Sequence, residues 1–275
     1  MKIKIIICIV LYKKKIEHLE IKNIINIKNI GNFEIRMCVF DNSPEYNPNG
    51  NHIKNIEYYP QNKNQGIALP YNYSLEIANS WNAQYIILLD QDTIIEELFF
   101  SLLENPIKEN CDIILPQIFH TNIHISPLRH NILSKKPLNI FKNNSPINYE
   151  NIRILFINSG TTISVNFLNK INGFNSLFWL DMQDYWLSLM AFKYKAKVKI
   201  LDYRIFHNLS VLNKEYISIE RYKNIHTSTA VFNFRYENFN RKIVYLLFLI
   251  LRYFKRINYL RKNKFLFEYW KLLFH

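Results

Sequence analysis

Short apolar runs and amphipathic segments alternate along the first half of the chain. The apolar runs fit strands that are covered on both faces, as in a parallel sheet. We expect strands at 3–11, 34–40, 58–60, 85–90 and 112–119. Between them, apolar residues recur at helical spacing, which predicts helices at 14–30, 71–81 and 94–103. This alternation is typical of an α/β domain with a mostly parallel sheet.

The second half begins with a long polar stretch. Residues 121–151 are rich in Asn, Pro, Ser and His, and we expect an irregular loop there, of the kind that often forms an active-site lid. Further strands are expected at 152–157 and 197–201, and further helices at 163–171, before Gly173, and at 185–194. These elements complete a predicted domain at residues 1–215.

Residues 216–275 are predicted to form a C-terminal helical segment that is basic and amphipathic. From Arg241 on, nine Lys and Arg residues stand against a single acid, Glu268. Such a basic amphipathic appendage fits a membrane interface with anionic lipid. The alternative is a helical pair that packs on the main domain or on a second subunit, as in a homodimer.

The composition limits the classes of protein that fit. With 49% hydrophobic residues over 275 positions, the chain can bury a full core. The formal charge of +13 is compatible with nucleic acid, an anionic membrane surface or a phosphate-rich small molecule. Three cysteines without a C-x-x-C pair favour buried thiols in a reducing compartment, so we expect a cytoplasmic protein. No apolar run is long enough for a spanning helix.

Carboxylates follow two of the predicted strands. Asp41 follows the second strand, and Asp90 and Asp92 follow the fourth. Ligands of open α/β sheets bind beyond the carboxyl ends of the strands, and two acids in a D-x-D pattern can converge on one hard cation that neutralises a diphosphate. The alternative is ordinary helix-start chemistry, in which Thr93 and Glu96 take part.

A second group of polar residues lies further along the chain. Asp184 opens a predicted helix, where it either complements the helix dipole or accepts a proton from an incoming hydroxyl. Asp181 is either part of the same site or a structural residue that orients the loop. His207 follows a strand and is either a metal ligand, a phosphate donor or a structural histidine.

These motifs, in this order and spacing, resemble the GT-A glycosyltransferases of family 2, and most of all their rhamnosyltransferase-like branch. Members of that branch show similar stretches of the type L-L-D-Q-D-[ST] and F-x-D-x-x-D. The resemblance covers about residues 3–210 and implies a Rossmann-like mixed, mostly parallel sheet flanked by helices. The residues that carry it are Asp41, Asn64, Gly66, Asp90, Asp92, Ser159, Gly160, Gly173, Phe174, Asp181, Asp184 and His207.

On the donor side, the resemblance implies that Asp41 binds the base or ribose of a nucleotide-sugar. Asp90 and Asp92 would lie at the diphosphate, with Asp92 the leading metal ligand and His207 near the metal. The cation would be Mn²⁺ or Mg²⁺. The remaining donor-binding positions are Asn64, Gly66 and Gln91.

On the acceptor side, Asp184 matches the catalytic base of this inverting family. Family members commonly have an acid beside or two residues after the base and an Arg about six residues after it, and those places here hold Gln183, Trp186 and Met190. The Q-x-x-R-W signature of processive synthases is absent, so transfer of a single sugar is expected. The acceptor-side positions are Ser159, Gly160, Trp179 and Asp181.

The expected function is therefore transfer of one sugar, from dTDP-rhamnose or a UDP-hexose, to a growing glycan such as lipopolysaccharide or capsule. We expect the protein to act on the inner face of the cytoplasmic membrane. Two alternatives stay open: a nucleic-acid-binding protein that uses the basic aromatic C-terminal segment, and a non-catalytic relative of the same fold.

Overall fold

The computed structural model describes residues 2–16, 19, 29–44, 55–130, 135–137, 152–206 and 219–260. For 135–137, 220 and 253–260 only the backbone is described. The chain divides into two compact units, Met1–Ser228 and Thr229–His275, which are described separately.

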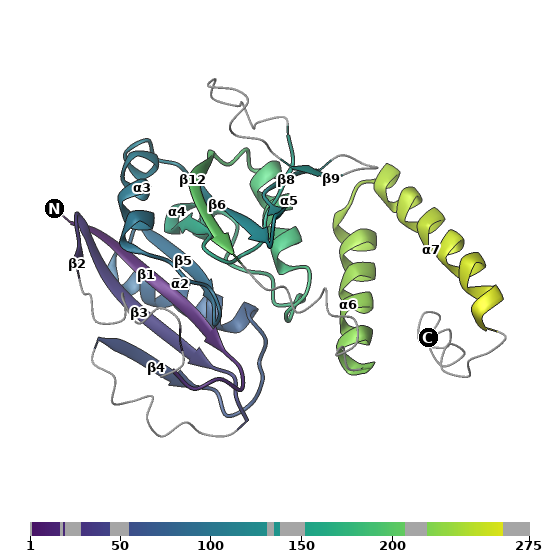
Figure 1. Ribbon diagram of the computed structural model, residues 1–275, viewed down its shortest axis with the longest axis horizontal. Coiled ribbons are helices and arrows are strands. Elements are labelled where there is room, and N and C mark those ends of the chain that lie inside the picture. Colours follow the sequence, from purple (N-terminus) through teal and green to yellow (C-terminus); the bar gives the residue numbers. More distant parts are fainter. Residues whose placement is uncertain are drawn as a thin grey trace. The chain divides into compact units, whose positions relative to one another are not determined.

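A nine-stranded mixed sheet forms the centre of the first unit (Figure 1). Its main path runs β12-β6-β11-β5-β1-β3-β2, with β4 on β3 and β7 on β6. The ladders of β1 with β3 and with β5, and that of β6 with β12, are parallel, whereas the antiparallel ladders of β11 are short. The strands are β1 (Ile3–Leu11), β2 (Asn29–Ile30), β3 (Phe33–Asp41), β4 (Ile56–Pro60), β5 (Tyr85–Asp90), β6 (Ile113–His120), β7 (Ile123–Ser126), β11 (Thr162–Ser164) and β12 (Val198–Phe206).

Helices cover both faces of this sheet, which is why its central strands are almost continuously apolar. On one face, Ile7 and Ile9 of β1 join a core cluster with Phe99 of helix α3 (Glu97–Lys108). On the other face, helix α2 (Ala68–Trp81) packs on β1, and its Ser74 lies near the thiol of Cys8. The predicted GT-A type of fold, a mixed, mostly parallel sheet flanked by helices, is confirmed.

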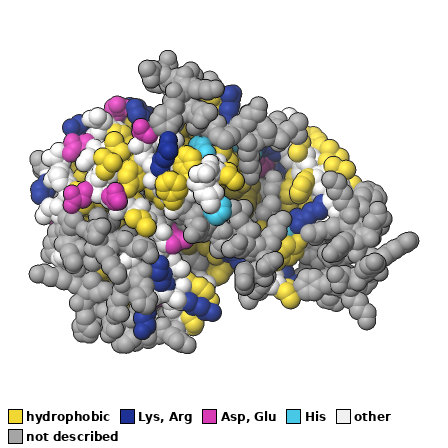
Figure 2. All heavy atoms as spheres, in the orientation of Figure 1, with side chains coloured by type: hydrophobic (Ala, Val, Ile, Leu, Met, Phe, Trp, Pro, Cys, Tyr) yellow, Lys and Arg dark blue, Asp and Glu magenta, His cyan; other side chains and the backbone are white. Residues whose placement is uncertain are grey.

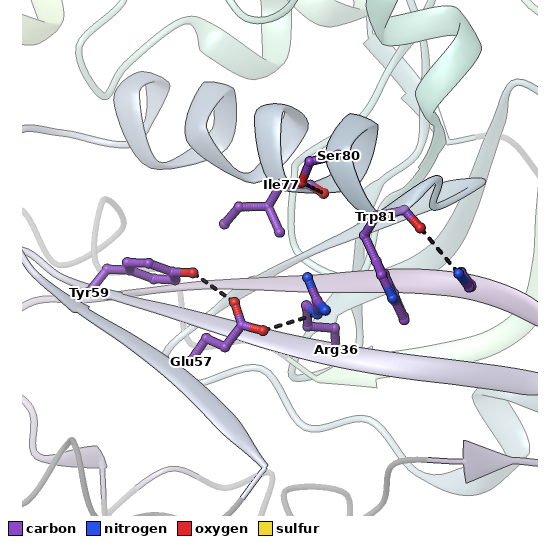
Figure 3. A network of polar contacts seen from close by, with 7 residues as sticks. Arg36, Glu57, Tyr59, Ile77, Ser80 and Trp81 are labelled. Atoms are coloured by element: carbon purple, nitrogen blue, oxygen red, sulfur yellow. Dashed lines mark hydrogen bonds and ion pairs between the residues drawn. The ribbon is translucent and has the colours of Figure 1, made fainter.

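The end of α2 is fixed over β3 and β4 by a polar network (Figure 3). Glu57 of β4 pairs with Nε of Arg36 at 3.0 Å and accepts a hydrogen bond from the hydroxyl of Tyr59 at 2.7 Å. The Arg36 guanidinium in turn lies 4.6 Å from the ring centroid of Trp81, the last residue of α2. Because α2 is held at this end, its other end is fixed at the carboxyl edge of the sheet.

Three predicted elements differ from the structure. The helix predicted at 14–30 falls largely outside the described residues. Its last two residues form β2 instead. The reason is a tight turn, with Gly31 at φ +54°, which returns the chain into β3. The irregular loop predicted at 121–151 contains strands instead. There β7 pairs with β6 as a hairpin, and a separate small sheet has the order β10-β8-β9. Its strands are β8 (Leu128–His130), β9 (Lys135–Pro137) and β10 (Ile154–Leu155).

The helix predicted at 163–171 is also partly a strand. Residues of β11 insert antiparallel between β5 and β6, and only then does α4 (Val165–Lys170) begin. The hydroxyl of Ser164 caps this helix by accepting a hydrogen bond from the N–H of Phe167 at 3.0 Å. Helix α5 (Gln183–Lys193) follows, close to its predicted position.

The second unit is helical in its described part. Helix α6 (Ile219–Val231) leads into it, and a short π-helix, η7 (Phe232–Tyr236), precedes helix α7 (Phe239–Leu260). Between these two helices, Glu237 pairs with Arg241 of α7 at 3.7 Å. No helix in the described ranges is long and apolar enough to cross a membrane.

Candidate active site

Two of the predicted acids lie on either side of β1 at the carboxyl edge of the sheet. In the parallel ladders, Leu11 of β1 is the partner of Asp41, and Val10 is the partner of Asp90. The backbones of Asp41 and Asp90 are thus separated by two strand spacings, or about 10 Å. This separation matches a site that spans a nucleotide, in which one acid is near one end of the ligand and the other acid is further along.

Asp41 is held in a fixed direction. Its side chain is 3% exposed. One carboxylate oxygen accepts a hydrogen bond from the hydroxyl of Tyr58 at 2.6 Å, and the other accepts one from the N–H of Ser43 at 2.9 Å. Tyr58 comes from β4, so the neighbouring strand orients the acid that is predicted to contact the base or ribose.

Asp90 and Asp92 belong to one tight turn. The N–H of Thr93 donates to the carbonyl of Asp90 at 3.0 Å, which closes a β-turn with Gln91 and Asp92 at its centre. Gln91 joins this turn to the end of β1, because its Oε1 accepts a hydrogen bond from the N–H of Tyr12 at 2.9 Å. The D-x-D pair therefore sits on a backbone that is anchored on both sides.

A lysine side chain, which the sequence alone did not indicate, also donates a hydrogen bond to this turn. Nζ of Lys14 donates to the carbonyl of Gln91 at 3.1 Å. Lys14 lies just beyond β1, between the strands that end in Asp41 and Asp90, so it is available to an anionic ligand at this edge. The order of strands in the sheet would have indicated it, but that order is not visible in the sequence.

Ser159 lies against the D-x-D turn. Its hydroxyl donates to the carboxylate of Asp90 and accepts a hydrogen bond from the hydroxyl of Thr93 at 3.2 Å. Its neighbour Gly160 donates its N–H to the carbonyl of Leu88 at 2.8 Å. Both residues were predicted on the acceptor side, and the structure brings them to the acid predicted to bind the donor.

The Asn64–Gly66 turn contacts the loop that carries Trp179. Oδ1 of Asn64 accepts from the N–H of Gly66 at 3.0 Å, and Nδ2 of Asn42 donates to the carbonyl of Gly66 at 2.6 Å. The N–H of Ile67 donates to the carbonyl of Trp179 at 2.8 Å. Predicted donor-side and acceptor-side segments thus meet through their backbones.

Asp184 lies in the first turn of α5 and is partly buried. Its Oδ1 accepts a hydrogen bond from the N–H of Tyr185 at 2.8 Å. The preceding Asp181 pairs with Arg221 of α6 at 2.9 Å. Burial raises the pKa of Asp181, and the charge of Arg221 opposes that rise.

Tyr71, which the sequence analysis did not identify, connects the two halves of the site. It is 1% exposed on α2 and lies near the side chain of Asn158. Burial raises the pKa of Tyr71 well above its ordinary value, with further contributions from the negative charges of Asp90, the Cys8 thiol group and Asp184. One phenol therefore lies within electrostatic reach of both Asp90 and Asp184.

The residues present fit a hard divalent cation. In the described ranges, no group of three or more His, Cys, Asp and Glu side chains lies close enough to hold a metal ion. Asp90 and Asp92 supply oxygen ligands from one turn, and one or two carboxylates completed by ligand phosphates and water are a common way to bind Mg²⁺. His207, predicted near the metal, lies outside the described residues.

The thiols are unsuited to metal binding. Cys8, Cys38 and Cys111 are buried and free, as the sequence predicted. Burial raises the pKa of Cys8 to about 12 and also raises the pKa of the other two thiols. Their protonated state leaves the oxygen ligands at the carboxyl edge as the metal-binding chemistry.

An open, mostly parallel sheet with carboxylates gathered at its carboxyl edge is the arrangement in which α/β proteins bind ligands at that edge, and this fold is of the GT-A class. The chain belongs to glycosyl transferase family 2, whose model matches residues 9–178. Among curated proteins no match was found.

Solved structures with the same fold include those of S. aureus TarS. The structure of TarS 1-349 in complex with UDP-GlcNAc has a TM-score of 0.53 and 17% identity, and the match covers 88% of this chain and 69% of that chain. The complex of TarS 1-349 with UDP has a TM-score of 0.52 and 15% identity, with 86% and 76% covered. Against the longer TarS chain, the match spans 40% of its length.

Proposed function

We propose that this protein is an inverting, metal-dependent glycosyltransferase that moves a single sugar from a nucleotide-sugar to a growing cell-surface glycan. The observation that carries the proposal is the placement of Asp41 and Asp90 on either side of β1, with Asp92 on the turn that follows Asp90. Membership in glycosyl transferase family 2 supports it.

The site residues would divide the chemistry between them. Asp41 orients the base or ribose of the donor, and Asp90 and Asp92 hold a cation at its diphosphate. When bound, Mn²⁺ or Mg²⁺ neutralises the charge that develops on the departing diphosphate. Asp184 accepts the proton of the acceptor hydroxyl as that oxygen attacks the anomeric carbon from the face opposite the diphosphate. This single displacement inverts the anomeric centre.

Two nucleotide-sugars are candidate donors. The complexes of TarS contain UDP and UDP-GlcNAc, and these favour a UDP-hexose for this chain. The resemblance of the L-L-D-Q-D-T stretch to the rhamnosyltransferase-like branch favours dTDP-rhamnose. For the acceptor we propose a lipid-linked glycan of the lipopolysaccharide or capsule type.

A donor screen with a matched control tests the proposal. Purified protein is incubated with Mn²⁺ or Mg²⁺ and with UDP-, dTDP- and GDP-sugars, and nucleotide release is followed. We expect release with one donor, its loss on chelation, and a loss of about 100-fold or more in Asp92→Asn. Asp202→Asn removes an exposed acid of β12 and should behave like the wild type. The absence of nucleotide release with every donor, or equal rates of release in Asp92→Asn and Asp202→Asn, would contradict the proposal.

We also propose that transfer takes place at the inner face of the cytoplasmic membrane, through α7. One stripe of this helix carries apolar side chains three and four residues apart, and they are between 39% and 74% exposed. These are Phe239, Ile243, Leu246, Leu247, Ile250 and Leu251. Figure 2 shows hydrophobic side chains in yellow over the start of α7.

Charge favours an anionic lipid surface over other partners of this face. The sequence of α7 contains five basic residues and no acid. An apolar stripe on a helix whose charged residues are all basic is typical of a helix that lies in a bilayer interface with anionic headgroups. Homodimerisation through the same stripe and nucleic-acid binding through its basic residues are the other outcomes that a test must separate.

Vesicle flotation distinguishes membrane binding from homodimerisation and from nucleic-acid binding. We expect the wild type to float with phosphatidylglycerol vesicles and not with phosphatidylcholine vesicles. Leu246→Ser/Leu247→Ser/Ile250→Ser should abolish flotation without changing donor binding. The matched control, Leu98→Ser, removes an exposed leucine of α3 and should float. Concentration-dependent dimerisation that the triple variant abolishes, or salt-sensitive binding to DNA or RNA in place of vesicles, would overturn the membrane role.

A further inference from the structure

The segment from 173 to 182 joins α4 to α5 and leads directly to Asp184. It carries the backbone carbonyl that contacts the Asn64–Gly66 turn, and it carries Asp181. We call residues 173–182 the acceptor loop. The position of this loop relative to α5 sets the distance between Asp184 and the groups that the loop contacts.

Two side-chain amides, the half-buried Asn72 and the fully buried Gln183, hold the start of this acceptor loop. Asn72 of α2 pairs with the backbone of Phe174 in both directions: its Nδ2 donates to the carbonyl at 2.9 Å, and its Oδ1 accepts from the N–H at 2.7 Å. Gln183 does the same to Asn175. With its amide oriented to match these neighbours, Gln183 donates to the carbonyl and accepts from the N–H, both at 3.1 Å.

Gln183 needs an amide for this task. Its side chain is 0% exposed, so water does not compete for the two backbone groups. The pairing requires one donor and one acceptor on the same side chain, whereas a carboxylate offers only acceptors. A buried donor or acceptor left without a partner costs about 1–3 kcal/mol. An ionised side chain at this depth would carry an additional desolvation cost.

Gln183 is also next to the proposed base. It is the first residue of α5, and Asp184 is the second. The helix has no side-chain cap, and the residue before it, Met182, is a non-glycine residue in the left-handed region at φ 69°. With no capping side chain, the bonds of Gln183 to Asn175 join the packing of α5 in setting the direction in which the helix starts.

We propose that Gln183 is a positioning residue for sugar transfer: its amide locks residues 173–182 to the start of α5 and so fixes Asp184 relative to the acceptor. The inference rests on the proposed role of Asp184 as base. It assigns Gln183, which stands where relatives commonly have an acid, a function that depends on its being an amide.

The test compares two substitutions of Gln183 with the same substitutions of Gln84. Gln84 serves as the control because it also pairs with two backbone groups, the N–H of Lys4 at 2.6 Å and the carbonyl of Asn82 at 3.1 Å. Unlike Gln183 it is exposed, and it lies at the amino end of β5. All four variants are assayed for turnover per folded molecule, donor binding and melting temperature.

Gln183→Met removes both hydrogen bonds at every pH. We expect kcat to fall about 10–100-fold, because a small misplacement of a reacting group has that effect, while donor affinity changes about twofold at most. Gln84→Met should leave kcat unchanged. A loss of melting temperature alone, with kcat intact, would identify Gln183 as structural and overturn the inference.

Gln183→Glu tests the proposal through the pH dependence of kcat, which a purely structural role would not change. The protonated carboxyl has one donor and one acceptor and reproduces the pairing, whereas the carboxylate does not. The kcat of Gln183→Glu relative to wild type should therefore fall as pH rises, while that of Gln183→Met should be low and independent of pH. A constant ratio for Gln183→Glu would contradict the proposal.

Hydrogen exchange separates failure of this inference from failure of the proposed function. If the wild type turns over no donor, the proposed function fails, and exchange at residues 173–182 still tests the lock. Faster exchange there in Gln183→Met than in Gln84→Met supports it, and equal exchange overturns it.

Discussion

The hydroxyl of Ser159 donates a hydrogen bond to the carboxylate of Asp90, although the two residues are 69 positions apart. Ser159 is fully buried, so the acid at the end of β5 is oriented by a residue that a bound ligand does not need to touch. This contact makes the segment before β11 part of the support for the D-x-D turn.

Ser159→Ala should weaken cation-dependent donor binding. Removing a hydrogen bond that orients a metal-binding carboxylate typically costs 10–100-fold in metal affinity. If Asp90 holds the cation as proposed, the Mn²⁺ concentration needed for half-maximal donor binding should rise by about that factor. Titration calorimetry with the best donor measures it. Ser101→Ala removes an exposed hydroxyl of α3 and should match the wild type. Equal Mn²⁺ dependence in both variants would show that Ser159 does not act through Asp90.

Gly66→Ala should destabilise the protein more than a second substitution with the same backbone strain. Gly66 has φ +72°, and an added Cβ would overlap the carbonyl oxygen of Trp179 and lie 2.7 Å from its carbon. At Gly31, φ is +54° but the nearest atom to an added Cβ is 3.7 Å away. We expect Gly31→Ala to cost about 1–2 kcal/mol and Gly66→Ala about 3 kcal/mol or more in free energy of unfolding. Urea denaturation of both variants decides this, and equal costs would disprove the close approach of Trp179.

Arg221→Met should make stability depend more strongly on pH. The pKa of Asp181 is raised by burial even with Arg221 beside it, and removing Arg221 should raise it further. A carboxyl whose pKa is higher in the folded state contributes stability at low pH and loses it as pH rises through the folded pKa. Relative to wild type, Arg221→Met should therefore lose more stability near neutral pH than at about pH 4 to 5. The double variant Asp181→Asn/Arg221→Met should lose this pH dependence; if it does not, another group is responsible.

His124 should destabilise the protein on acidification. Burial lowers the pKa of His124, which stacks on Phe119 at 5.0 Å and pairs with the carbonyl of Ser126 at 2.7 Å. A histidine with a lowered folded pKa binds its proton more readily when unfolded, so stability falls as pH drops below its unfolded value of about 6.5. His124→Phe keeps the ring stack and should flatten the stability curve in this pH range. A curve identical to the wild type in urea titrations would assign the acid sensitivity elsewhere.

The sheet could be predicted because its signal is local. Runs such as 3–11 and 85–90 are apolar since both faces are covered, and this shows in the sequence without knowledge of neighbours. The elements that were mispredicted depend on distant partners: β7 and β11 are strands because β6 and β5 offer open ladders to them, and no local pattern records that.

The site followed the same division. The position of Asp41, Asp90 and Asp92 at the ends of strands could be predicted, because acids after buried strands are visible in the sequence. Tyr71, Lys14 and Arg221 could not, since each matters only through residues far away in the chain. Gln183 appeared in the sequence only as a departure from the family pattern, and its pairing with Asn175 gave it a structural meaning.

By itself, the sequence determined that this chain forms an α/β sheet with carboxylates at its strand ends, because hydrophobic periodicity and run length reflect local burial. Only the tertiary structure decided which of those carboxylates are neighbours. The order of strands places β1 between β3 and β5, and it brings Ser159 to Asp90 and the loop of Trp179 to Gly66. The physical reason is that strand order and side-chain hydrogen bonds are set by packing between distant segments, which leaves no periodic trace in the sequence.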